Sequence, residues 1–169
     1  MIAKTDIVAA EFHHNYINLA KEEEIGKALK KNTEQFRKFL KKIPKKKIDY
    51  AYAEGKWTIR EMFQHIIDAE RVFVYRALSF SRLDATPLPG FDENTWAVHA
   101  GAAARNWNDM QEEFKLLRKS TEVFFASLTD AQLKFIGEAN GSPLNGAALG
   151  FITPGHVAHH MNILKERYL

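Results

Sequence analysis

The sequence predicts an all-α protein, a four-helix bundle with one long crossover connection. The main observation is that four stretches of about 20 residues carry apolar side chains at intervals of three and four residues, as amphipathic helices do. Helices of that length are about 30 Å long, which suits a four-helix bundle. No stretch shows the alternating pattern and turn chemistry of strands. We therefore expect no β-sheet. The sequence also lacks an internal repeat, and its length suits a single domain over residues 1–169.

The first two long helices have recognisable ends. The first is expected to begin near Glu22–Glu24, because acidic side chains favour a helix N-terminus, and to end at Ile43-Pro44. The second is expected to begin at Thr58, since Thr58 and Glu61 have the spacing of a capping box. An apolar stripe then continues to Phe80, which gives this helix its buried face.

The connection to the third long helix is long for a bundle, so we expect it to cross over or to cover one end. It contains the breaker run 87–90, and only a short helix fits between Asp92 and Val98. Thr129 begins a further turn or two, a turn follows at 141–143, and the last helix runs from about 145 to 167. The third long helix has a predicted buried line of Met110, Phe114, Leu117, Phe124 and Leu128.

Composition excludes several classes of function. Cysteine is absent, which excludes disulfides, Fe–S clusters, thiolate zinc sites and thiol nucleophiles. The net charge is only +3, and the lysines between residues 41 and 47 fit a solvated helix end, so we expect no nucleic-acid partner. The first residues lack a signal-peptide layout, and no apolar run reaches membrane-spanning length. We therefore expect a cytoplasmic protein with no membrane partner.

Three histidines are candidates for a metal site. His156 and His160 lie four residues apart in the last predicted helix, so both imidazoles share one face. A third imidazole from His65, in the second helix, would complete a three-histidine site with open coordination positions, as catalytic metal sites have. His159 lies three residues from His156, and the spacing alone does not decide between the two pairs. Ordinary core or surface histidines are the alternative interpretation.

The donor set limits the metal and its surroundings. Nitrogen and oxygen ligands suit Zn, Ni, Fe, Mn or Co. Asp68, one turn beyond His65, is a candidate to orient an imidazole or to accept a proton, although a surface ion pair would also explain it. Glu61 is explained by its cap. The remaining histidines have no partner at ligand spacing and are expected at the surface; they are His13, His14 and His99.

Aromatic residues flank the predicted site. The run Pro87–Asp92 is either a lid, with Phe91 or Trp96 shaping a substrate pocket, or an ordinary crossover loop. Packing in the core is the expected role of Trp57.

Several motifs in this sequence resemble those of the DinB-like superfamily. The resemblance extends from about Phe12 to Leu169. Its motifs are Gly55–Glu61, His65–Arg71, Tyr75–Ala77, Pro87–Asp92, Gly155–His160 and Lys165–Leu169.

The resemblance implies a four-helix bundle with a long crossover and a divalent metal at one end. Its ligands would be His65 from the second helix and the pair His156 and His160 from the last, with His159 as a neighbour. Members include S-transferases that use low-molecular-weight thiols, thiol-dependent isomerases and metal-dependent hydrolases. We therefore expect an enzyme whose Zn, Ni, Fe or Mn ion activates water or a thiol cosubstrate for attack on a small molecule. A homodimer is also implied, and the alternative function is a non-catalytic binding module.

Overall fold

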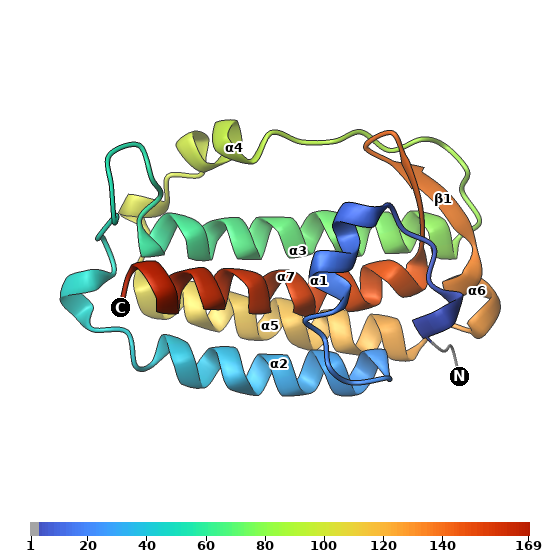
Figure 1. Ribbon diagram of the computed structural model, residues 1–169, viewed down its shortest axis with the longest axis horizontal. Helices are drawn as coiled ribbons and strands as arrows, with labels where there is room; N and C mark the ends of the chain where they lie inside the picture. Colours follow the sequence, from blue (N-terminus) through green and yellow to red (C-terminus); the bar gives the residue numbers. More distant parts are fainter. Residues whose placement is uncertain (1–3) are drawn as a thin grey trace.

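Four long helices lie lengthwise beside one another in the computed structural model, which describes residues 4–169 (Figure 1). Helix α7 (Gly146–Arg167) packs against both α2 (Ile25–Leu40) and α3 (Ile59–Ser81). Helix α5 (Trp107–Ala126) packs against the same two helices from the other side. The predicted four-helix bundle is therefore confirmed.

The long connection is the unusual part of the topology. Helices α3 and α5 run in the same direction because the chain between them returns along the whole length of the bundle (Figure 1). This crossover carries α4 (Glu93–His99) and a 3₁₀ turn at Ala102–Ala104. The predicted crossover is thus observed, and it runs along the flank of α3 rather than only over one end.

Side-chain caps fix where two of the long helices begin. The amide of Glu61 donates to Thr58 Oγ1 at 3.1 Å and the amide of Thr58 donates to Glu61 Oε2 at 2.7 Å, which completes the predicted capping box of α3. Asn145 Oδ1 accepts a hydrogen bond of 2.9 Å from the amide of Ala148 and caps α7. Helix α7 then continues past Pro154 without interruption.

The prediction of no β-structure is wrong. Strands β1 (Ile136–Ala139) and β2 (Ser142–Asn145) form an antiparallel hairpin. Its two turn residues, Asn140 and Gly141, both have positive φ angles, of 53° and 69°, as a tight Asn-Gly hairpin turn requires. Four residues per strand are too few to show a clear alternation, so only the Asn-Gly pair indicated the hairpin.

Short elements occupy the N-terminal segment and the connections. Two 3₁₀ turns, Lys4–Asp6 and Glu11–His13, lead into the single helical turn α1 (His14–Ile17), which packs on α7. A 3₁₀ turn at Lys45–Lys47 follows α2, and α6 (Asp130–Lys134) precedes the hairpin. Within residues 4–169 no helix has both the length and the apolar character needed to cross a bilayer.

The predicted buried line of α5 is only partly correct. Met110 and Phe114 are fully buried, as predicted, but the line continues through Arg118 and Phe125. The predicted residues Leu117, Phe124 and Leu128 are only half-buried. The apolar pattern predicted positions one residue too early, because the residue at the centre of the buried face is charged rather than apolar.

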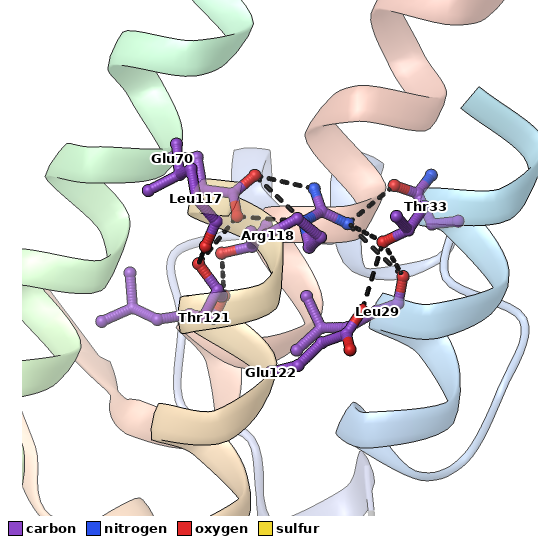
Figure 2. A network of polar contacts seen from close by, with 10 residues as sticks. Leu29, Thr33, Glu70, Leu117, Arg118, Thr121 and Glu122 are labelled. Carbon is purple, nitrogen blue, oxygen red and sulfur yellow. Dashed lines mark hydrogen bonds and ion pairs between the residues drawn. The ribbon is translucent and has the colours of Figure 1, made fainter. Parts of the chain in front are cut away.

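That charged side chain is Arg118, which forms a buried ion pair with Glu70 of α3 (Figure 2). The guanidinium donates from Nε at 2.9 Å and from an Nη at 2.8 Å to the two carboxylate oxygens. Its other Nη donates to Asn32 Oδ1 of α2 at 3.0 Å, and Thr121 Oγ1 donates to Glu70 at 2.8 Å. Since both charges are well satisfied, the pair can be buried between α2, α3 and α5.

Candidate metal centre

Three imidazoles meet where α3 packs against α7. His65 projects from α3, and His156 and His160 project from α7, one helical turn apart. Their candidate ligand atoms all lie within 4.8 Å of one another. The Nε2 atom of His156 is 3.1 Å from Nε2 of His65 and 3.0 Å from Nε2 of His160. The tertiary structure therefore brings together all three histidines on which the sequence argument rests.

Burial keeps these imidazoles uncharged near neutral pH. His156 is 5% exposed and His160 is 8% exposed. Desolvation lowers the pKa of His65 to about 4 and that of His160 to about 3, and it lowers the pKa of His156 well below its ordinary value. Each neutral ring keeps one nitrogen lone pair, which is the form that binds metals.

The three side chains fit a divalent cation. Neutral imidazoles whose Nε2 atoms converge from two helices provide the donor set of a three-histidine site with free coordination positions. Within the described residues, Nδ1 of His160 is buried without a hydrogen-bond partner. Packing with neighbouring rings orients this imidazole instead, with centroid distances of 4.4 Å to His156 and 4.9 Å to His65.

His159 lies outside the group. Its half-buried ring meets the ring of Tyr16 edge-on at 5.3 Å, and its nitrogens are not among the converging donors. Of the two pairs that the spacing allowed, the geometry selects His156 with His160. His156 is the eleventh of the 22 residues of α7, so the group lies on the flank of the bundle rather than at the end that the resemblance suggested.

Aromatic rings surround the imidazoles. The Trp57 ring lies 4.9 Å from that of His65, and the rings of Phe73 and Tyr16 meet His156 edge-on at 5.4 and 5.5 Å. Trp57 also packs on the apolar core around α3, as expected, in addition to its contact with His65. These rings remove water from the histidines, which explains their depressed pKa values.

A cavity of about 380 Å³ opens beside the histidine group. Its walls come from the N-terminal segment, α3, the crossover, the hairpin tip and α7. The lining residues are Phe12, His13, Tyr16, Trp57, His65, Ala69, Phe73, Arg76, Gly90, Phe91, Glu93, Asn140, Ile152, His156 and His160. A volume of this size accepts a small organic molecule.

The crossover run does border this cavity. Phe91 lines it, and the Trp96 ring packs against the Phe91 ring at a centroid distance of 4.6 Å and an interplanar angle of 38° while remaining 44% exposed. Of the two aromatic residues considered for a lid, Phe91 therefore lies in the cavity wall, and Trp96 packs on Phe91 from outside the cavity.

Asp68 lies outside the cavity lining. Its Oδ1 accepts a hydrogen bond of 2.9 Å from Gln64 Nε2, and Arg71 lies 3.7 Å away. Burial is the largest effect on its carboxyl group and raises its pKa. The ion-pair interpretation of Asp68 thus has contacts to support it.

The prediction that His13 is a surface residue is wrong. His13 lines the cavity, and its Nδ1 is buried without a partner among residues 4–169. Burial, followed by the charge of Arg76, lowers its pKa to about 4. His14 and His99 are exposed, as predicted. Neither His13 nor Arg76 has a spacing signal, because the folded N-terminal segment brings His13 to the site.

Comparisons with known proteins agree with this architecture. Residues 28–164 match the family model described as the DinB superfamily. A protein of Oceanobacillus iheyensis named "Putative metal-dependent hydrolase" is 28% identical over 120 residues. That alignment covers 68% of this chain and 66% of the relative, so the chain spans just under two thirds of the relative's length.

Two solved structures share the fold. YfiT from Bacillus subtilis, described as "a probable metal-dependent hydrolase with an unusual four-helix bundle topology", superposes with a TM-score of 0.69 at 19% identity. The match covers 94% of this chain and 87% of YfiT. A mycothiol-dependent maleylpyruvate isomerase superposes with a TM-score of 0.68 at 12% identity, covering 96% of this chain and 62% of that protein.

Proposed function

This chain belongs to the DinB superfamily, and from that premise we propose that it is an enzyme whose divalent metal is held by His65, His156 and His160. The observation that carries the proposal is the convergence of three uncharged imidazoles, two buried and one half-buried, beside a cavity of about 380 Å³. The names of the Oceanobacillus relative and of YfiT, which both refer to metal-dependent hydrolysis, support it.

The proposed chemistry is hydrolysis or thiol transfer on a small molecule. A divalent ion such as Zn, Ni, Fe or Mn would act as a Lewis acid and lower the pKa of water or of a low-molecular-weight thiol. The thiol alternative is supported by the fold shared with a mycothiol-dependent isomerase. Because the chain has no cysteine, the thiol would be a cosubstrate from outside the protein.

The protein's own residues would hold and shield the reacting groups. The three histidines supply neutral nitrogen donors, and donors of this kind bind a cation without a competing proton. Trp57, Phe73 and Tyr16 exclude bulk water from one side of the donor set, which strengthens electrostatic interactions there. The same three rings belong to the wall of the cavity, where a substrate can enter beside the histidines.

The decisive measurement is the metal content of protein purified without a His tag or added metal. We expect about one equivalent of metal, the stoichiometry of a mononuclear site, and its loss in His160→Ala. His159→Ala is the matched control, since His159 lies outside the converging donors and should leave the metal in place.

Retention of full metal by His160→Ala would contradict the ligand assignment. Protein that contains no metal and takes up none of these ions, with its fold intact, would contradict the enzymatic proposal and leave a helical binding module. With metal present, loss of hydrolase or thiol-transfer activity on chelation would support the proposed chemistry.

A further inference from the structure

Arg76 is a buried cation without a counter-ion in the described part of the chain. It is 7% exposed, and one Nη donates a hydrogen bond of 3.0 Å to the backbone oxygen of Pro89. The other buried arginine, Arg118, is fully paired with Glu70. Burying an unpaired charge is costly, so a protein normally supplies a partner. Burial lowers the pKa of Arg76, but a guanidinium remains protonated at neutral pH.

Arg76 shares a wall of the cavity with the histidine group. His65, Ala69, Phe73 and Arg76 all line it, and they follow one face of α3 because 11 residues make just over three complete turns. The Cα atoms of His65 and Arg76 are therefore about 16 Å apart along the helix axis. Helical side chains lean toward the N-terminus, so the long Arg76 side chain leans toward His65.

A polar atom without a hydrogen-bond partner belongs to the same cavity wall. Nδ1 of His13 is buried without a partner among residues 4–169, and His13 lines the same cavity. The two residues are near enough for the charge of Arg76 to act on the His13 imidazole. A neutral imidazole can carry its proton on Nδ1 and donate it to an acceptor.

The crossover and the hairpin hold this part of the wall in place. The amide of Leu88 donates to the backbone carbonyl of Glu138 at 2.9 Å, and the amide of Asn140 donates to the backbone carbonyl of Leu88 at 3.0 Å. Gly90 lies so close to the Asn140 side chain that a β-carbon there would overlap Oδ1 unless that side chain moved. Arg76 is bonded to the residue between Leu88 and Gly90, which fixes the guanidinium at a preformed wall.

We propose that Arg76, assisted by His13, binds the carboxylate of a small organic acid whose other end reaches the three-histidine group. The planar guanidinium matches a carboxylate in a two-bond geometry. The cavity wall also contains Glu93, which disfavours a dianion such as phosphate. Phe12, Phe73 and Phe91 would pack on an apolar body. This inference rests on the proposed function, because it assigns the substrate class to the same cavity.

The test is calorimetric binding of phenylacetate, its neutral amide phenylacetamide, and inorganic phosphate to the full-length, metal-containing protein. We expect the wild type to prefer phenylacetate to both other probes. Arg76→Gln should weaken phenylacetate binding by about tenfold or more, the typical effect of losing a hydrogen bond to a charged group, and leave phenylacetamide unchanged. Arg82→Gln, at an exposed arginine outside the cavity lining, should bind all three probes as the wild type does.

Equal binding of the acid and the amide by the wild type overturns the proposal without any variant. Unchanged phenylacetate binding in folded Arg76→Gln also overturns it, as does phosphate binding as tight as that of phenylacetate. If the glutamine variant does not fold, Arg76→Lys, which keeps the charge and loses the planar fork, should show an intermediate loss.

Metal content measured in the same samples separates this proposal from the previous one. In His160→Ala, discrimination between acid and amide that depends on Arg76 should persist, since Arg76 is not a ligand. Metal retained by the wild type without that discrimination overturns the carboxylate site alone. Discrimination in a wild-type protein that binds no metal supports the carboxylate site and overturns the metal centre alone.

Discussion

Gly155 lies directly against the backbone carbonyl of Tyr16, so closely that a β-carbon at position 155 would overlap that oxygen. This contact seats the N-terminal segment on α7 one residue before His156. It also places the Tyr16 ring against the His156 ring. A glycine in the middle of a helix, normally unfavourable, is therefore explained by close packing of backbone at the site.

Gly155→Ala should accordingly destabilise the protein. The added methyl group must push the Tyr16 backbone away, and overpacking of this kind costs about 1–3 kcal/mol of unfolding free energy. Urea denaturation gives that value directly. Gly26→Ala is the matched control, because nothing lies within 4 Å of a β-carbon there, and it should be neutral or slightly stabilising. Equal stability of the two variants would contradict the packing argument.

Breaking the buried ion pair should be far more damaging than breaking an exposed one. Arg118→Met leaves Glu70 as a buried carboxylate without its partner, which typically costs about 3–5 kcal/mol. Lys115→Met removes an exposed pair with Glu112 on the same helix and should cost less than about 1 kcal/mol. Chemical denaturation measures both. A loss below 1 kcal/mol for Arg118→Met would show that the network is not structurally important.

Stability of the chelated protein should fall as the pH decreases from about 6.5 toward 4. The pKa of His13 is lowered to about 4, so between these values the unfolded chain binds the proton more readily than the folded one. The stability that the uncharged His13 side chain contributes is therefore present above pH 6.5 and is lost as the pH falls toward 4. Replacing His13 by Gln should flatten this dependence, measured as unfolding free energy against pH.

His14→Gln is the control for that measurement, since the neighbouring side chain is exposed. The depressed pKa values of His65 and His160 should leave part of the slope in every one of these proteins. A wild-type stability that rises on acidification through this range would contradict the predicted direction.

Bound metal should raise the melting temperature, and chelation should lower it. A ligand that binds only the folded state stabilises it by mass action, by about 2.7 kcal/mol at a free concentration of 100 times its dissociation constant. His65→Ala should lose this response and stoichiometric metal together. Thermal unfolding with added Zn, and then with chelator, provides the measurement. A full response retained by His65→Ala would exclude His65 as a ligand.

The sequence alone determined the helical class and the long crossover, because both depend on local information. Apolar spacing marked the four long helices, Thr58 and Glu61 marked the start of α3, and the breaker run 87–90 marked the crossover. The four-residue spacing of His156 and His160 was likewise visible along one helix. His65 could be predicted as the third member of the histidine group from its place in the second helix together with the family resemblance.

Only the tertiary structure decided which side chains meet. Packing of α3 on α7 completed the histidine group, and folding of the N-terminal segment brought His13 and Tyr16 to it. The buried pair of Arg118 and Glu70 and the uncompensated charge of Arg76 depend on contacts between segments far apart in the chain. Hydrophobic periodicity reports which face of one helix is buried. It does not report which charged partner lies opposite that face. For this reason the buried polar residues of the core and of the cavity wall could not be predicted from the sequence.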